Sequence, residues 1–236
     1  MASLAIDGLT KRFGKKTAVD DLSFAVGAGE IVGLLGPNGA GKSTTFLALA
    51  GFLRPESGTI SWDGVPLGPE RGRVISLIPE TPEVYPVLTI WEHLVFVAKS
   101  SRLAPGWESK GATLLERLGL ADQRDTLGRA LSKGMRQKTL IAATLLADTP
   151  VLLLDEPMIG LDPQGQRELR EMLLQLRADG TAILISTHMI EQAQQLCDRI
   201  VIIKEGRFVA GGTFDELRER VGREDAEELF LELTRA

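Results

Sequence analysis

A glycine-rich segment that ends in a lysine and two hydroxyl residues is the first stretch of this chain whose residue types could do chemistry. The segment GPNGAGKST, residues 36–44, has the Walker A spacing of a glycine, four residues and Gly-Lys-Ser. Glycines let successive backbone N–H groups converge on phosphate oxygens, because no Cβ blocks the approach. The segment EIVGLL before the motif is typical of a strand, and STTFLALA after it opens a helix whose N-terminal dipole attracts the same oxygens. We therefore expect a nucleotide phosphate site here.

Each polar side chain of this segment has its own expected role. Lys42 can reach the β- and γ-phosphates, Ser43 can ligate Mg²⁺, and Thr44 can hydrogen-bond a nearer phosphate. The expected nucleotide-binding residues of the segment are Gly36, Pro37, Asn38, Gly39, Ala40, Gly41, Lys42, Ser43 and Thr44.

Two acidic residues follow the apolar segment VLLLD at its carboxyl end. A strand that is apolar on both faces lies inside a sheet, and ligands of open α/β sheets bind at the carboxyl ends of the strands. We expect Asp155 to hold Mg²⁺ through water and Glu156 to orient and deprotonate an attacking water, a role worth roughly 10²–10⁴ in rate. The alternative is an acidic residue that caps a helix at a strand–helix turn.

A histidine follows a second apolar strand, AILIST. A lone histidine at a strand end is often structural. Here three strand ends are expected to meet at one cleft, so His188 could hydrogen-bond the γ-phosphate and sense its presence. His93, inside TIWEHLVF, has no such neighbours and is interpreted as an ordinary helix residue.

Short apolar strands that alternate with helical patterns must position these residues, which indicates an α/β sheet covered by helices. The expected strands are residues 3–9, 30–36, 73–79, 151–155, 182–187 and 199–206. Residues 83–149 have helical periodicity, with turns near Pro105-Gly106 and Gly119, and predict a helical subdomain inserted into a core of residues 1–82 and 150–218. The acidic tail, residues 219–236, predicts a solvated surface helix.

Composition narrows the classes of protein to which the chain can belong. The 236 residues are 44% apolar and 25% charged, with a net charge of −5, so no overall basic surface suits nucleic acid. A single cysteine, Cys197, excludes an intramolecular disulfide and a cysteine-rich metal site, and we interpret it as a small core residue. No apolar run approaches the roughly 18 residues of a membrane span, and the N-terminus lacks the pattern of a signal peptide. We expect a cytoplasmic chain that meets a membrane only through a partner.

The order of the motifs is more specific than any one of them. After Walker A come LSKGMRQ, VLLLDEPMIGLDP and LISTHMIEQA, and in this order the chain resembles the ATP-binding subunit of an ABC transporter from about residue 4 to residue 217. The resemblance implies one ABC ATPase domain over residues 1–236. The implied fold is a P-loop NTPase core with a mixed sheet flanked by helices, an N-terminal antiparallel β subdomain and an inserted helical subdomain.

The segment LSKGM occupies the place of the family signature, usually Leu-Ser-Gly-Gly-Gln. The resemblance implies that two subunits pair head to tail, so that Ser132 and the amides near Gly134 bind the γ-phosphate of ATP held by the other subunit. Lys133 replaces a glycine and Met135 a glutamine. Lys133 could add a cation beside phosphate, or face solvent.

Three further residues take roles from the same resemblance. Phe13 stands where the family has an aromatic residue that stacks on adenine, with a core residue as the alternative. Asp162 resembles a residue in the loop that contacts the opposite subunit and its nucleotide. Glu80 stands where the family usually has a glutamine that touches Mg²⁺, and a carboxylate there could be a metal ligand.

The resemblance implies a Mg²⁺-dependent ATPase with ATP as its nucleotide. Two copies, identical or different, would close around two ATP molecules and drive a separate transmembrane permease, so the chain would lie on the inner face of the cell membrane. Tyr85, Leu88 and Trp91 are candidates for the contact with the permease, with core packing as the alternative for Trp91. The variant signature and Glu80 favour bacterial exporters.

Two other functions remain open from the sequence. A soluble ABC-type ATPase would clamp nucleic acid or ribosomes, but the stretch between Lys42 and Asp155 has room for a compact subdomain and no long arm, and no nucleic-acid partner is expected. A nucleotide-binding regulator with little turnover would not need Glu156 and His188.

Overall fold

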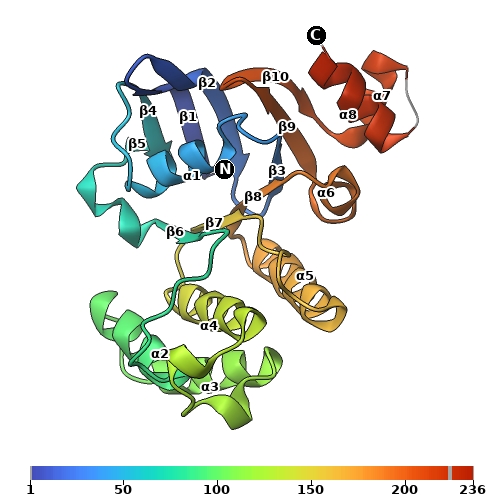
Figure 1. Cartoon of the computed structure of the whole chain (residues 1–236). Helices are drawn as coiled ribbons and strands as arrows, with labels where there is room; N and C mark the ends of the chain where they lie inside the picture. The colour runs from blue at the N-terminus through green and yellow to red at the C-terminus, as the bar shows by residue number, and fades with distance from the viewer. Residues whose placement is uncertain (1, 223–224, 236) are drawn as a thin grey trace. The chain divides into compact units, whose positions relative to one another are not determined.

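The computed structural model describes residues 2–222 and 225–235, and the chain divides into two compact units. The first unit is Met1–Leu77, Pro150–Glu156 and Leu174–Ala236, and the second is Ile78–Thr149 and Pro157–Leu173. Figure 1 shows a strand-rich first unit and a helical second unit. The helical segment predicted at residues 83–149 lies in the second unit, which also contains residues 157–173.

A six-stranded mixed sheet carries the predicted strand ends. Its order is β10-β9-β3-β8-β7-β6, where the strands are β3 (Ile31–Leu35), β6 (Ile75–Ile78), β7 (Val151–Asp155), β8 (Ala182–Thr187), β9 (Arg199–Lys204) and β10 (Arg207–Gly212). β3 pairs in parallel with β8 and β9, β7 pairs in parallel with β8, and β10 pairs antiparallel with β9. Every residue of β3, β7 and β8 is buried, as their continuous apolar sequences predict.

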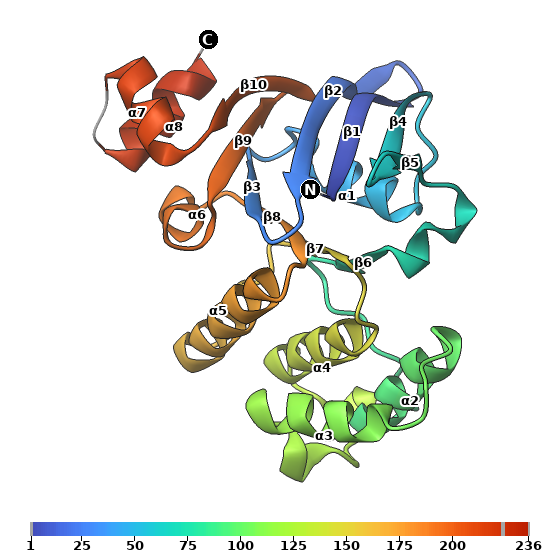
Figure 2. The same ribbon diagram turned by 180° about the vertical axis from the view of Figure 1, so that it is seen from behind.

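A four-stranded antiparallel sheet forms the rest of the first unit's β-structure. Its order is β2-β1-β4-β5, where the strands are β1 (Ser3–Phe13), β2 (Lys16–Gly27), β4 (Ser57–Trp62) and β5 (Val65–Pro66). Helix α1 (Lys42–Ala50) contributes Phe46 and Leu49 to a core that also contains Leu4 and Leu9 of β1. Figure 2 shows α1 against this sheet. The predicted α/β fold with a mixed sheet and an antiparallel β subdomain is confirmed.

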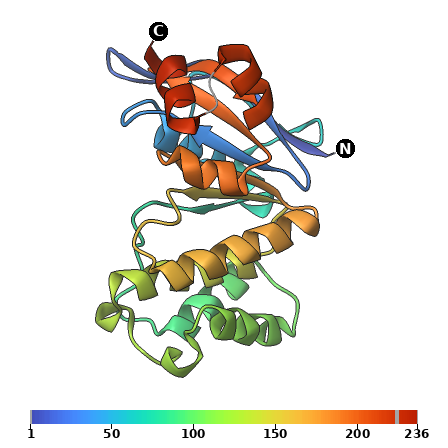
Figure 3. The same cartoon turned by 90° about the vertical axis from the view of Figure 1, so that its right-hand side faces the viewer.

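The C-terminal part of the first unit is helical and packed. Helices α6 (Ile190–Leu196), α7 (Phe214–Val221) and α8 (Ala226–Arg235) share a core in which Leu217 and Leu229 are fully buried. Figure 3 shows α7 and α8 beside α6 and β10. The tail predicted as a solvated surface helix is thus a surface helix with one buried face; residues 223–224 and 236 lie outside the described part. Cys197 is half-buried, and burial raises the pKa of its thiol to about 12, which suits the predicted packing role.

The second unit is built from α2 (Ile90–Ser100), α3 (Trp107–Arg117) and α4 (Lys133–Leu146), and α5 (Pro163–Ala178) begins in it. Thr89 and Glu92 form a capping box that starts α2, and Gly106 at φ 99° precedes α3 near the predicted turn. Short 3₁₀ turns occupy Pro69–Arg73 in the first unit and Ala121–Gln123 and Gly128–Ala130 in the second. Within the described ranges, no helix has both the length and the apolar character needed to cross a membrane.

Candidate functional site

The Walker A segment forms the loop between β3 and α1, and two of its glycines have no room for a side chain. A Cβ on Gly36 would lie 2.4 Å from the carbonyl oxygen of Ile203, and one on Gly41 would lie 2.4 Å from that of Ala18. Gly41 also has φ 106°, which strains any other residue. The backbone of β9 and of β2 therefore packs closely against this loop.

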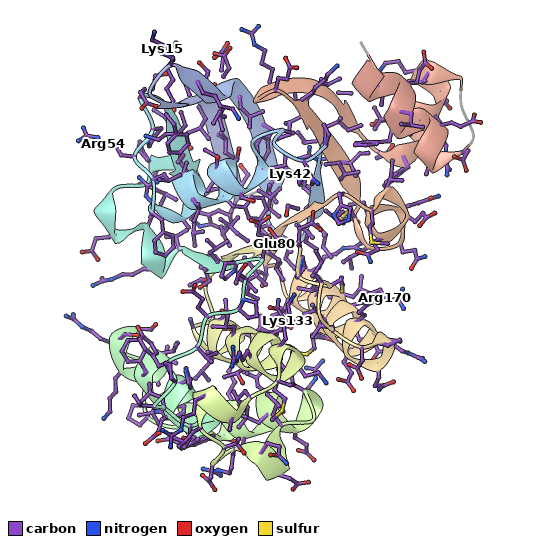
Figure 4. The ribbon with its side chains drawn as sticks, in the orientation of Figure 1. Lys15, Lys42, Arg54, Glu80, Lys133 and Arg170 are labelled. Atoms are coloured by element: carbon purple, nitrogen blue, oxygen red, sulfur yellow. The ribbon has the colours of Figure 1, made fainter. Side chains whose placement is uncertain are left out.

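The Lys42 side chain is buried and bonds to the first residues of this loop. Only 8% of the residue is exposed, and its Nζ donates to the carbonyl oxygens of Gly36 at 2.7 Å and Pro37 at 3.4 Å. Figure 4 labels Lys42 where the loop meets α1. Thr45, which the sequence analysis did not single out, donates its hydroxyl to Gly41 at 2.9 Å and closes the first turn of α1. Ser43 is exposed and Thr44 half-buried.

Three predicted site segments leave the sheet at the carboxyl ends of its parallel strands. Leu35, the last residue of β3, pairs with Thr187 of β8, and Ser186 of β8 pairs with Asp155 of β7. The phosphate loop, the segment with His188 and the two acidic residues therefore follow neighbouring parallel strands, as ligand sites of open α/β sheets require.

Ser186 organises the end of β7, and the sequence analysis missed it. Its buried hydroxyl donates to Asp155 Oδ1 and accepts from the backbone N–H of Glu156 at 3.0 Å. Glu156 has φ 49°, a left-handed conformation that is unusual for a non-glycine residue. A hydroxyl inside an otherwise apolar strand was the signal in the sequence, but its partners depend on strand register.

Glu156 and His188 form a side-chain pair. His188 Nδ1 lies 2.9 Å from Glu156 Oε1, with 49% of the histidine side chain exposed and 10% of the glutamate's. A carboxylate only accepts hydrogen bonds, so Nδ1–H donates and Nε2 of neutral imidazole remains an acceptor. A nearly buried carboxylate held by an exposed imidazole can accept a proton from water. The alternative role of Glu156 as a mere helix cap has no support in these contacts.

Phe13 lies at the end of β1, in a hairpin that packs on the phosphate loop. Its side chain is 50% exposed, which excludes the core alternative, and Phe13 pairs with Lys16 across a two-residue turn. Two residues further along β2, Ala18 packs closely against Gly41 and against Gly206 of the β9–β10 turn. The hairpin that packs on the phosphate loop thus also carries an exposed aromatic ring.

Oxygen ligands for a metal ion are few. In the described part of the chain, no three residues among His, Cys, Asp and Glu cluster as a metal site. The Ser43 hydroxyl and the Asp155 carboxylate fit Mg²⁺, which prefers oxygen ligands and usually keeps several waters beside substrate phosphates. This donor set does not fit a metal held by protein ligands alone.

The other predicted site residues lie in the second unit, where the signature segment begins α4. Ser132 caps this helix by accepting from the N–H of Met135 at 3.2 Å. A Cβ on Gly134 would lie 3.2 Å from the carbonyl oxygen of Gly160, and one on Gly160 would lie 3.2 Å from Lys133 Cε. The aliphatic part of the Lys133 side chain thus contacts the loop that follows Glu156, and Lys133 as a whole is exposed (Figure 4).

Asp162 holds the start of α5 in its own unit. Its Oδ1 accepts from the N–H of Gly165 at 3.2 Å and lies 4.0 Å from Lys138 Nζ of α4. Gln137, which the sequence analysis did not name, is buried on α4 and donates to the carbonyl of Pro157 at 3.4 Å. Contacts of Lys138 and Gln137 therefore connect α4 to the loop that contains Asp162. Glu80, at the start of the segment that leads to α2, is exposed.

His93 lies in α2, as predicted, and it also fixes the segment that leads to this helix. It is buried, its Nε2 accepts from the N–H of Tyr85 at 2.9 Å, and its Nδ1 lies 2.6 Å from the carbonyl oxygen of Thr89. Tyr85 is exposed, whereas Trp91 is half-buried against Trp107, with ring centroids 5.4 Å apart. Leu88 is half-buried.

Comparisons with known proteins agree with these features. The family model for the ABC transporter matches residues 19–159. The Nod factor export ATP-binding protein I of Ralstonia nicotianae is 40% identical over 91% of this chain and 68% of its own length. A fluoroquinolones export ATP-binding protein of Mycobacterium tuberculosis is 40% identical over 91% of this chain and 72% of its own. A solved structure of an ATP binding subunit of an ABC transporter has a TM-score of 0.93 and 38% identity over 98% of both chains. The chain belongs to the ABC transporter family, as an ATP-binding subunit with ATPase activity.

Proposed function

We propose that this chain hydrolyses Mg²⁺-bound ATP with Glu156 as the base and with His188 as the group that positions it. The observation that carries the proposal is the 2.9 Å pair between His188 Nδ1 and Glu156 Oε1, beside the strand that leads into the phosphate loop. A glutamate held in this way can orient a water and accept its proton as the water attacks the γ-phosphate. About half of the His188 side chain is exposed, which leaves the imidazole accessible for the proposed contact with the γ-phosphate.

The phosphate loop supplies binding rather than proton transfer. Lys42 exchanges its contacts with the Gly36 and Pro37 carbonyls for β- and γ-phosphate oxygens, and the N–H groups that start α1 bind the same phosphates. Ser43 and Asp155 would hold Mg²⁺, which neutralises the charge that develops on the phosphates. Glu80 is proposed as a further ligand, and Phe13 as the ring that stacks on adenine.

Two copies are proposed to complete the sites, with Ser132 and the amides near Gly134 of one copy on the γ-phosphate of the other. An exposed helix N-terminus with no acidic residue in its first turn supports this, because such an end attracts anions. Asp162 is proposed at the same interface. Closure of the pair would drive a transmembrane permease from the cytoplasmic face of the membrane.

Export is the proposed direction of transport. Two of the relatives described above are named as export proteins, for Nod factor and for fluoroquinolones. The permease, rather than this chain, is proposed to select what is moved. The exposed Tyr85 next to α2 is proposed to contact that permease.

Glu156→Gln tests the catalytic proposal. The variant should bind ATP with unchanged affinity, release phosphate at least 100-fold more slowly, and accumulate as an ATP-bound dimer in size-exclusion chromatography. Glu219→Gln, which removes an exposed carboxylate from α7, is the matched control and should behave as wild type. Wild-type turnover by the Glu156 variant would exclude that residue as the base.

The same variant tests the partner. Affinity capture of Glu156→Gln from detergent-solubilised membranes of the native host, with ATP, should recover a multi-span protein in stoichiometric amount. Recovery of only ribosomes, nucleic acid or soluble proteins would contradict the proposed transport function and leave the ATPase site unaffected.

A further inference from the structure

We propose that Lys11 is a positioning residue for nucleotide binding, because it holds the Phe13 ring in the orientation that stacks on adenine. The proposal rests on the proposed role of Phe13 and adds a residue that neither the motifs nor the comparisons assign. The expected ligand is the adenine base of ATP, and the effect is on base recognition rather than on phosphate chemistry.

The geometry places the lysine on the ring itself. Lys11 Nζ lies 5.4 Å from the centroid of the Phe13 ring, within the reach of about 6 Å for a cation–π contact. The two residues are two positions apart at the end of β1. Half of Phe13 is exposed, so the hydrophobic core alone does not fix this ring.

Lys11 is itself held firmly. Its Nζ donates to the carbonyl oxygen of Arg54 at 2.8 Å and to Glu56 Oε1 at 3.2 Å, and only 14% of its side chain is exposed. Glu56 Oε2 accepts from the N–H of Arg12 at 2.8 Å. This bond, together with Lys11, lowers the pKa of Glu56 below its usual value. Figure 4 shows the Arg54 side chain pointing away from the ribbon, so only its carbonyl serves Lys11.

These contacts connect the strand that carries the Phe13 ring to both ends of α1, the helix that follows the phosphate loop. Residues 51–56 connect the end of α1 to β4, and the Lys11 anchors lie in this connection. At the other end, the hairpin that carries Phe13 packs against Gly41, which directly precedes α1. The strand that carries the ring is therefore tied to both ends of α1, the helix that follows the phosphate loop.

The physical benefit is preorganisation. An exposed aromatic side chain that can rotate loses conformational entropy when a base stacks on it, and this loss weakens binding. A cation held over one face restricts the ring before the nucleotide arrives and leaves the opposite face for adenine. Because the Lys11 ammonium is bonded to the Arg54 carbonyl and the Glu56 carboxylate, we expect its removal to weaken ATP binding and to leave the binding of a ligand without a base unchanged.

The test compares ATP with inorganic triphosphate on the full chain by isothermal titration calorimetry. Lys11→Met should weaken ATP binding about threefold, the size of an exposed cation–π contact, and leave triphosphate affinity unchanged. In ATPase assays KM for ATP should rise by the same factor with kcat unchanged. Lys11→Arg keeps the cation and should restore most of the affinity. Lys15→Met removes a lysine from the exposed hairpin turn and is the matched control, which should bind ATP as wild type.

A double-mutant cycle separates this proposal from the role of Phe13. Phe13→Ala should weaken ATP binding, and Lys11→Met should add nothing in the Phe13→Ala background. If Phe13→Ala leaves ATP affinity unchanged, the proposed stacking role is wrong, and the role of Lys11 with it. If Phe13→Ala weakens ATP binding but Lys11→Met has no effect, or has the same effect in both backgrounds, only the Lys11 proposal is overturned.

Two controls detect a general structural effect of Lys11→Met. An equal loss of affinity for ATP and for triphosphate would show such an effect and would also overturn the Lys11 proposal. Lys11→Arg keeps the test decisive if Lys11→Met does not fold, because an Arg variant that folds but binds ATP as weakly as Phe13→Ala would contradict the proposal.

Discussion

Replacing Ser186 by alanine tests whether a buried hydroxyl holds the acidic end of β7 in place. The change removes the hydroxyl that donates to Asp155 and that accepts from the Glu156 N–H. The Glu156 N–H keeps its other acceptor, the Ser186 backbone carbonyl, at 3.2 Å. A hydrogen bond to a buried charged group contributes about 1.5–3 kcal/mol, so the free energy of unfolding should fall by about 2 kcal/mol. For a chain of this size that corresponds to a drop in Tm of about 4–8 °C. Because Asp155 and Glu156 both lose a fixed neighbour, kcat should fall about tenfold, with a smaller change in KM.

Thermal unfolding followed by circular dichroism, together with steady-state phosphate release, measures both effects. Ser23→Ala is the control, because the Ser23 hydroxyl also accepts a backbone N–H, that of Gly8, on an exposed strand. It should change the free energy of unfolding by less than about 1 kcal/mol and leave kcat as in wild type. A Ser186→Ala protein that melts within a degree of wild type and keeps its kcat would refute the role assigned to this hydroxyl.

Three further substitutions test other parts of the structure. Gly41→Ala should weaken ATP binding at least tenfold by calorimetry, because its Cβ would lie 2.4 Å from a carbonyl oxygen; near-normal affinity would contradict the tight loop. His93→Phe should lower the free energy of unfolding by about 2 kcal/mol in urea titrations, because the N–H of Tyr85 loses its acceptor; an unchanged midpoint would contradict that anchor. Glu56 has a pKa below its usual 4.5, so its contribution to stability is full above pH 4.5 and is lost as pH falls through the lowered value. Glu56→Gln should therefore flatten the acid limb of stability against pH, and an acid limb identical to that of wild type would show that the carboxylate contributes nothing.

The phosphate loop and the strands around it could be predicted from the sequence because their signals are local. The Gly36–Thr44 spacing needs one turn of backbone, and the fully apolar β7 and β8 can only lie inside a sheet. In contrast, β2, β4, β5 and β10 were not among the predicted strands. β2 pairs with β1 through several register shifts, and β5 has only two residues, so neither has a clear alternating pattern.

The residues that support the site were harder to predict, because their roles depend on distant partners. Ser186 meets Asp155 only once β8 is paired with β7 in one register. Lys11 meets Glu56 across 45 positions of sequence. His93 has a partner eight residues away in an irregular segment, which no periodicity describes. Motifs thus identify groups that can touch a nucleotide, whereas the groups that hold them still emerge only from tertiary structure.

The boundary between the two units has a mechanical consequence for Glu156. The first unit ends one of its segments at Glu156, and Pro157 already belongs to the second unit. Proline has a fixed φ near −65°, so the rotation available at this crossing lies mainly in the backbone of Glu156 itself, which starts from φ 49°. The chain passes between the two units at four places, and this one lies one peptide bond from the proposed base. A rotation about the Glu156 backbone would turn the proposed base in or out of alignment without any change in the phosphate loop, so this connection is a point at which hydrolysis could be gated.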